Sequence, residues 1–320
     1  MTPNGPDEIT RSFPVSGPAR LTLRNVDGSI DIAAGEANEI SVHAVKHPGR
    51  GANQTEIEIT QAPDGEVSVI THYLEDVIAR LFHPLHGGPA RVDYTVRLPK
   101  NCEVDVAFVS GQARLQNLAG GLKIRSVSGR IELQDLAGRA EINTVSGPVS
   151  AARVQFDGGV MLETVSGDVV FREASVPAIA AHSVSALVRL ETALGAGPYE
   201  FRGVSGDVWL VAPSLAGCQV DLHALSGRLH TNAPARRQRL DSGHTQADFG
   251  AGGDGPRVRV NTVSGDLHLV TPDGPAGLEP QTPAPAAESA PPAATDRMAI
   301  LERIARGELS VDEALTTLKQ

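Results

Sequence analysis

Serine hydroxyls are the most frequent candidates for chemistry in this chain, because a serine followed by glycine recurs along it. The segment 203–206 (Gly-Val-Ser-Gly) approaches a nucleophile elbow, but its second glycine comes one position too early. A catalytic nucleophile is normally unique, whereas this serine returns every 18–21 residues between Ser110 and Ser226. We therefore expect structural corners instead of a catalytic site. The predicted corners are Ser110 and Gly111, Ser128 and Gly129, Ser146 and Gly147, Ser166 and Gly167, Ser205 and Gly206, Ser226 and Gly227, and Ser264 and Gly265.

Aspartates follow the corner glycine in three repeats, at Asp168, Asp207 and Asp266. A row of carboxylates could bind calcium or a sugar, as acidic β-helices can. Other residue types hold the same position in the remaining repeats, and two of these are arginines, so the row is interrupted. We therefore expect solvated side chains here and no metal ion.

Histidines and cysteines give weak patterns. His83 and His86, with His72 nearby, could supply metal ligands, but the pair has neither a helical register nor a third ligand, which favours a loop. Cys102 and Cys218 form no close-spaced motif, which predicts neither a disulfide framework nor a cysteine-based zinc site. We expect no catalytic residue, no metal site and no cofactor.

Composition limits the partners and the compartment. A net charge of −10 and an aromatic content of 3% disfavour nucleic acid, because phosphate binding needs a basic face. No apolar stretch is long enough to span a bilayer, and residues 1–15 show no secretory signal. We therefore expect a cytoplasmic protein without a transmembrane segment.

Apolar side chains recur around each corner with a spacing of two, which is typical of strands that bury one face. One repeat has Leu122 and Ile124 before the corner, Val127 at it, and Ile131 and Leu133 after it. The odd step between the second and third of these residues requires a bend if both side chains are to stay inside. Repeats of this kind bury their faces by stacking. The sequence predicts an all-β fold, a β-solenoid with coils of about 18–21 residues.

The pattern also divides the chain into segments. Alternation around an Asp-Gly turn predicts a hairpin at 54–70, and an apolar stripe predicts a short helix at 72–82 that covers the rod. An irregular insertion at 235–256 precedes the last coil at 257–270. The predicted organisation is a disordered N-terminus at 1–11, a β-solenoid domain at 12–270 (irregular at 12–102, regular coils at 103–270), a disordered Pro/Ala-rich linker at 271–295, and a helical module at 296–320.

The tail at 296–320 carries two apolar stripes at helical spacing, and Gly307 can end the first helix. Each helix is too short to be stable alone in water, so the pair must dock on its own rod, on another copy or on a partner. The residues expected to make this contact are Met298, Leu301, Ile304, Val311, Leu315 and Leu318.

Three segments carry a family resemblance. The opening run at 21–30, the run at 92–100 and the closing run at 249–267 are similar to the bacterial β-strand-repeat family labelled "putative adhesin", a domain of unknown function. The resemblance covers about residues 12–270 and implies a head-domain-like β-solenoid without catalytic residues. The tail is similar to the short two-helix C-terminal module of envelope-stress-associated members.

These observations favour a non-enzymatic scaffold or binding protein whose ligand the sequence does not identify. The resemblance connects it with cell-envelope stress, and the tail predicts self-association or recruitment of a protein partner. One alternative is a cell-surface adhesin. A second alternative is a polysaccharide-acting β-helix enzyme, which would need paired carboxylates or a metal cluster on one face.

Overall fold

The computed structural model describes residues 6–49, 52–73, 89–240, 243–250 and 255–272. Within these residues every regular element is a β-strand, apart from one 3-10 turn, η1 (Ala52–Gln54), which confirms the predicted all-β class. The described strands form two long, mostly parallel sheets of 12 and 13 strands.

Contacts divide the chain into two compact units. As far as they are described, unit 1 comprises Met1–Arg114 with Arg125–Gly129, and unit 2 comprises Leu115–Ile124 with Arg130–Glu279. Strands β9 (Gln112–Gln116) and β10 (Gly121–Ser126) contribute residues to both units.

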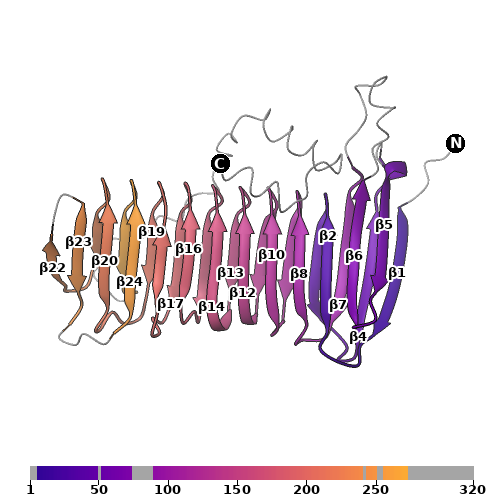
Figure 1. Cartoon of the computed structure of the whole chain (residues 1–320), viewed down its shortest axis with the longest axis horizontal. Coiled ribbons are helices and arrows are strands. Elements are labelled where there is room, and N and C mark those ends of the chain that lie inside the picture. Colours follow the sequence, from indigo (N-terminus) through magenta and orange to yellow (C-terminus); the bar gives the residue numbers. More distant parts are fainter. Residues whose placement is uncertain (1–5, 50–51, 74–88, 241–242, 251–254, 273–320) are drawn as a thin grey trace, which may run out of the picture. The chain divides into compact units, whose positions relative to one another are not determined.

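Unit 1 contains two runs of paired strands (Figure 1). One has the order β1-β4-β7-β3, with β3 and β7 parallel and the other pairs antiparallel. The second has the order β8-β2-β6-β5, parallel except for the β5–β6 hairpin, which confirms the hairpin predicted at 54–70. The bounds are β1 (Asp7–Pro14), β2 (Arg20–Asn25), β3 (Ser29–Ala34), β4 (Glu39–Lys46), β5 (Thr55–Gln61), β6 (Glu66–Tyr73), β7 (Val92–Leu98) and β8 (Glu103–Phe108).

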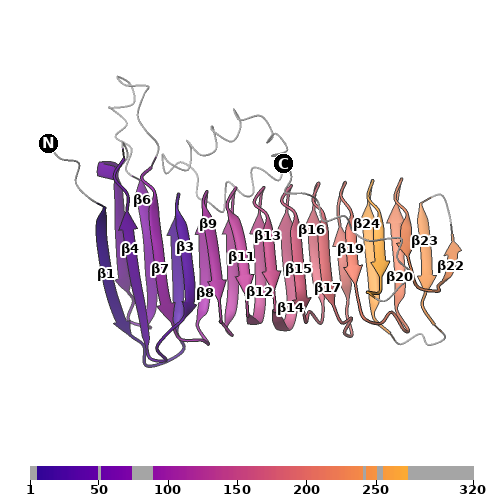
Figure 2. The same cartoon turned by 180° about the vertical axis from the view of Figure 1, so that it is seen from behind.

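Unit 2 is a β-solenoid-like stack in which each coil contributes one strand to each sheet (Figure 2). Equivalent repeat positions pair in parallel from coil to coil, as for Ile131, Val149, Val169, Val188 and Val208. The bounds in one sheet are β11 (Arg130–Gln134), β13 (Val149–Ala152), β15 (Val169–Ala174), β17 (Val188–Thr192), β19 (Val208–Val211), β21 (Leu229–Thr231) and β25 (Leu267–Val270). Those in the other are β12 (Ala137–Thr144), β14 (Gln155–Thr164), β16 (Ile179–Ser183), β18 (Tyr199–Arg202), β20 (Gln219–Ala224), β22 (Arg236–Arg239), β23 (His244–Asp248) and β24 (Arg257–Thr262).

The last coil does not stack in sequence order. Strands β24 and β25 lie between the two preceding coils, in the orders β18-β24-β20 and β19-β25-β21. The expectation that successive repeats lie one above another is therefore wrong here. The predicted insertion at 235–256 forms the β22–β23 hairpin, and β23 pairs antiparallel with the outer edge of β20. This hairpin occupies one edge of β20. The last coil therefore pairs with the opposite edge of β20, through β24, and lies between β20 and β18.

The core is lined by small and branched apolar side chains, as the alternation predicts. Ile124, Val127, Ile131 and Leu133 are all buried. The few buried hydroxyls have partners: Tyr199 Oη donates to the Val176 carbonyl at 2.8 Å. Inward alternation therefore removes the apolar face from water without leaving this phenol unpaired.

Buried hydroxyls just before the corner valines close several corners. The Ser126 hydroxyl accepts a hydrogen bond from Gly129 N–H at 3.0 Å, and Thr144 and Thr164 make the same bond to the glycine three residues later. Gly129 has no room for a side chain, since an added Cβ would lie 2.0 Å from Phe108 Cε2.

The ends of the described chain differ from the sequence predictions in specific places. Asp7–Pro14 form β1 and pair with β4, so residues 7–11 belong to a strand although a disordered N-terminus was expected at 1–11. The helix expected at 72–82 is wrong at its start, because residues 72 and 73 belong to β6. The rest of that helix, residues 273–295 of the linker and the helical module at 296–320 lie outside the described residues.

Candidate functional site

Two groups of histidine and aspartate side chains come together in unit 2. Among the described residues these are the groups whose ligand atoms could converge on a metal ion, with all three atoms of each within 4.8 Å of one another. We name them the Asp221 cluster (Asp221, His223 and His244) and the Asp266 cluster (His230, Asp266 and His268).

The Asp221 cluster lies on two antiparallel strands. Asp221 and His223 are two positions apart on β20, so they share one face, and His244 on β23 pairs directly with His223. Both imidazole Nε2 atoms approach the same carboxylate oxygen, Asp221 Oδ1, at 3.2 Å from His223 and 2.6 Å from His244. The two rings stack with centroids 3.8 Å apart.

An open groove of about 480 Å³ borders this cluster. It is lined by charges of both signs, among them Glu200, Asp248 and Arg257. Arg259 also lines it and places its Nε 3.8 Å from Asp221 Oδ2, the oxygen that the histidines do not contact. Of the three cluster residues only Asp221 lines the groove, so small solutes reach the cluster from the side of this carboxylate.

The Asp266 cluster lies on the other sheet and depends on the displaced last coil. Because β25 lies between β19 and β21, His268 is stacked between Trp209 (ring centroids 3.7 Å apart) and His230 (4.7 Å). His230 Nε2 lies 3.0 Å from Asp266 Oδ2. The Nδ1 atom of His268 is buried with no hydrogen-bond partner in the described structure.

Opposite electrostatic effects act within the Asp266 cluster. Burial, followed by the nearby charge of His230, lowers the pKa of His268, although Asp207 and Asp266 act against this. Burial alone would raise the pKa of Asp266, but hydrogen bonds from Arg228 N–H and His230 outweigh it and lower that pKa. The stacked imidazole is therefore held in its neutral form and the carboxylate in its charged form.

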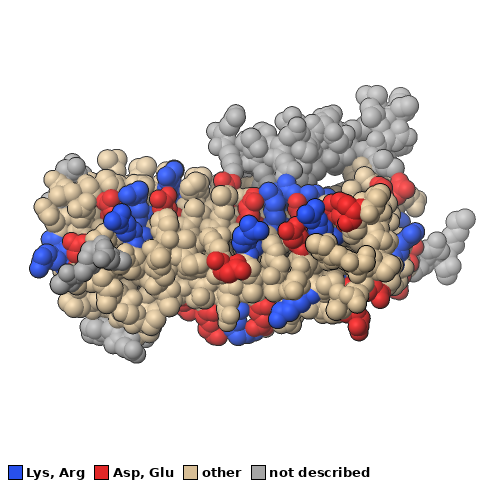
Figure 3. Space-filling view, turned by 60° about the horizontal axis from the view of Figure 1, so that its bottom comes forward, with Lys and Arg blue, Asp and Glu red and all other residues tan. Residues whose placement is uncertain are grey.

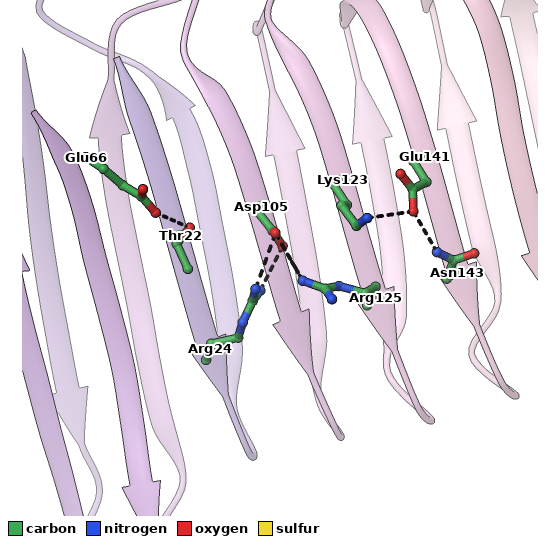
Figure 4. Close-up of polar contacts among 8 residues, drawn as sticks. All are labelled: Thr22, Arg24, Glu66, Asp105, Lys123, Arg125, Glu141 and Asn143. Atoms are coloured by element: carbon green, nitrogen blue, oxygen red, sulfur yellow. Dashed lines mark hydrogen bonds and ion pairs between the residues drawn. The ribbon is translucent and has the colours of Figure 1, made fainter. Parts of the chain in front are cut away.

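Unit 1 contains a charged group of a different kind. Asp105 lies between two guanidinium groups, 2.7 Å from Arg24 and 2.9 Å from Arg125 (Figure 4). Burial would raise the pKa of Asp105, but the hydrogen bonds and charges of both arginines lower it. On the face drawn in Figure 3, acidic and basic side chains lie among one another.

Four apolar corner residues of unit 2 are exposed. Val184, Val204, Val263 and Leu225 stand at equivalent positions of adjacent coils, and we name them the corner row. Leu225 is 80% exposed and Val204 51%, whereas the equivalent Val145 is 6% exposed.

A family profile matches residues 19–270, which is most of the chain. The chain belongs to the Toastrack DUF4097 family. This match confirms the family resemblance found in the sequence for the β-strand repeats. It ends before the tail, so the two-helix module stays a prediction.

Several solved structures are similar to this Toastrack chain at low sequence identity. A "putative adhesin" from Parabacteroides distasonis is 10% identical, with 83% of this chain and 98% of that chain covered and a TM-score of 0.39. A "putative lipid binding protein" from the same organism is 11% identical, with 81% and 96% covered and a TM-score of 0.42. A "putative adhesin" from Bacteroides fragilis is 8% identical, with 82% and 97% covered and a TM-score of 0.38. No curated protein matches this chain. The described residues include no helix with the length and hydropathy needed to cross a membrane.

The corner serines of the Toastrack repeats contact neighbouring coils. In unit 1, Ser128 Oγ donates to the Val109 carbonyl at 3.1 Å. In unit 2, Ser185 Oγ lies 3.5 Å from the Val165 carbonyl, a long contact of the same kind. The serine hydroxyls thus face backbone acceptors of the adjacent coil.

The three aspartates expected to be solvated also contact backbone. Asp168 Oδ1 accepts a hydrogen bond from Leu187 N–H, and Asp207 Oδ1 accepts one from Asp266 N–H at 2.8 Å. Asp266 Oδ1 in turn accepts one from Arg228 N–H. These aspartates are partly exposed, and each carboxylate also binds an amide of the adjacent coil.

The histidines and cysteines singled out in the sequence do not come together in the described structure. His72 pairs with Glu58 at 2.9 Å, while His83 and His86 lie outside the described residues, as do all six tail residues. Cys102 and Cys218 are unpaired and buried, and burial is the main cause that raises their thiol pKa values, to about 12 and about 11. Neither thiol is a reactive nucleophile.

Sequence reasoning missed both histidine–aspartate clusters of this Toastrack chain. A signal was present, since the tripeptide Asp-Leu-His occurs at 221–223 and again at 266–268. In a strand its first and third side chains point the same way. The third ligand, His230 or His244, comes from another strand, so spacing alone could not supply it.

Proposed function

We propose that this Toastrack chain is a non-enzymatic scaffold or binding protein that associates with other copies of itself. The observation that supports this proposal most directly is the corner row, an unbroken line of exposed apolar side chains on adjacent coils of unit 2. A solvent-exposed apolar line of this kind is typical of a contact surface.

The corner row is fixed by backbone pairing. Ser205 N–H donates to the Val184 carbonyl, and Ser264 N–H donates to the Val204 carbonyl, each at 2.8 Å. Ser226 N–H continues the series to the Val263 carbonyl. Neighbouring row residues are therefore about 4.8 Å apart, the strand spacing of a sheet. A row that is already ordered loses little conformational entropy on binding.

The proposed occupant is the tail of a second copy. The sequence at 296–320 has two apolar stripes at helical spacing, and a helix of this kind needs an apolar surface to become stable. Covering a half-exposed valine contributes on the order of 1 kcal/mol, and Leu225 contributes more. Four such residues support an association of moderate affinity.

Two features support a non-enzymatic role. The Asp105 carboxylate is bound by Arg24 and Arg125, which hold its pKa below the ordinary value, so it is unsuited to act as a general acid. The hydroxyl of Ser128 is directed at a backbone carbonyl. Turnover on a panel of polysaccharides that is abolished by one carboxylate substitution would contradict this part of the proposal.

Sedimentation velocity at micromolar concentration tests self-association. We expect the full chain to sediment as an oligomer, and both the 1–295 truncation and Leu225→Ser to sediment as monomers. Met161→Ser is the matched control, because Met161 is exposed but lies outside the corner row, and it should behave as the wild type. Equal masses for all four proteins would refute the proposal. Dissociation of the truncation alone would refute the corner row as the tail's binding surface.

A cytoplasmic location is part of the same proposal. Cell fractionation tests it, with recovery in the soluble cytosol expected. Recovery at the cell surface would favour the adhesin alternative instead.

A further inference from the structure

We propose that the Asp221 cluster binds one divalent transition-metal ion of the zinc type, with Asp221, His223 and His244 as its ligands. This inference is independent of self-association. It rests on donor chemistry, on the convergence of the three ligand atoms and on the open groove beside them.

The donor set fits such an ion. Two imidazoles and one carboxylate are ligands that zinc and its neighbours in the transition series accept readily, whereas calcium and magnesium prefer oxygen alone. The ligands come from β20 and β23, which pair antiparallel with His223 opposite His244. Both strands are held by their backbone ladder, so the ligands are largely positioned before an ion arrives.

The distances require only a small adjustment. Bonds of about 2.0–2.1 Å in a tetrahedral site place neighbouring ligand atoms about 3.3 Å apart. His223 Nε2 lies 3.2 Å from Asp221 Oδ1, which already meets this distance. His244 Nε2 lies 2.6 Å from the same oxygen, so these two atoms must separate by about 0.7 Å. The two stacked rings must also tilt apart so that both nitrogen lone pairs point at one ion.

The arrangement makes two imidazoles share one acceptor. Both Nε2 atoms approach Asp221 Oδ1, and their rings stack at 3.8 Å with 22° between the planes. A single divalent ion would replace both N–H donors and satisfy all three ligands at once.

The surroundings leave room for further ligands. The groove of about 480 Å³ is lined by Asp221, so water or a small anion can approach the ion from the side of this carboxylate and complete the coordination. Arg259 Nε lies 3.8 Å from Asp221 Oδ2, whereas both histidines approach Oδ1. Its side chain is 54% exposed, so it can turn toward solvent when an ion binds.

The Asp266 cluster serves as the internal comparison. Its Asp266 carboxylate already accepts hydrogen bonds on both oxygens, from Arg228 N–H and from His230. We therefore assign no metal to it.

Isothermal titration of the full chain, prepared without a polyhistidine tag, tests the proposal with zinc chloride at neutral pH. We expect one zinc ion per chain for the wild type. His223→Ala and His244→Ala should each bind zinc at least about tenfold more weakly. Losing a group that only hydrogen-bonds to a metal ligand already costs about tenfold or more in affinity, and losing the ligand itself should cost at least as much. His230→Ala, in the Asp266 cluster, should bind as the wild type does.

Two further readouts keep the test decisive. Cobalt should give the visible absorption of a tetrahedral complex in the wild type and lose it in His223→Ala. Zinc should raise the melting temperature of the wild type but not of His223→Ala, whose side chain is exposed and whose circular dichroism should be unchanged. No zinc binding by the wild type would overturn the proposal, and so would zinc binding by His223→Ala and His244→Ala as tight as that of the wild type.

Discussion

Gly129→Ala tests whether the coil corner in unit 1 is closed by packing. A Cβ at this position would lie 2.0 Å from Cε2 and 2.8 Å from Cδ2 of Phe108, and 3.0 Å from the Gly111 carbonyl oxygen. Carbon atoms normally stay about 3.5–4.0 Å apart. The Phe108 ring would therefore have to withdraw by about 1.5 Å, although it is fully buried.

The expected cost follows from this collision. Overpacking a core by one methyl group costs about 1–3 kcal/mol. We expect Gly129→Ala to lower the free energy of unfolding by this amount, measured by urea denaturation followed by circular dichroism. Gly17→Ala is the control, because an added Cβ there meets nothing within 4 Å, and its change should stay within about 0.5 kcal/mol.

A double-mutant cycle identifies the cause. Phe108→Leu removes the ring atoms that the new methyl group would meet, so it should offset part of the cost of Gly129→Ala. We expect a favourable coupling of about 1 kcal/mol or more in the double variant. Additive changes, or a Gly129→Ala variant as stable as the wild type, would refute the proposed collision.

Three further predictions concern single contacts. Ser126→Ala should lower the free energy of unfolding by about 1–3 kcal/mol, because it leaves a buried corner amide unpaired; an unchanged urea midpoint would contradict this. Asp105→Asn should cost about 1–3 kcal/mol at neutral pH by leaving Arg125 without its carboxylate. Because the pKa of Asp105 is lower in the folded state, its charge stabilises the fold at pH values above the pKa of the unfolded chain. The difference in unfolding free energy between the wild type and Asp105→Asn should therefore shrink as pH falls below about 4. A difference that does not change with pH would contradict the mechanism. The emission of Trp209, the one tryptophan, should titrate with His268 at a midpoint below 6.5, and fold stability should fall as pH drops through that range; a midpoint above 6.5 would contradict the lowered pKa of His268.

Much of the fold could be predicted because local pattern decides it. The alternation of Ile131 and Leu133, with the odd step to Val127, sets which side chains point inward and where the chain bends. The hairpin turn could be predicted from its Asp-Gly pair, which is also a local signal. In the structure Gly65 has a φ of +88°, which glycine adopts without strain.

The order of the coils could not be predicted in this way. All coils have the same inward pattern, so residues 257–270 can pair as well with one neighbour as with another. The β22–β23 hairpin decides which neighbour the last coil pairs with, because it covers one edge of β20. The sequence of this hairpin shows no repeat pattern, so its pairing could not be predicted. The Asp266 cluster depends on that choice, because His268 meets His230 and Trp209 only in this order.

The displaced coil has a consequence for biosynthesis. Strands β24 and β25 are the last described strands to leave the ribosome, yet their places lie between strands made earlier. Until residue 270 has been translated, β18 and β20 each have an edge with no permanent neighbour, and such edges readily pair with other chains. This end of the protein therefore cannot grow by adding each newly made coil to the preceding one. Its assembly must wait for a late segment, which makes the nascent chain most vulnerable to aggregation just before its β-structure is complete.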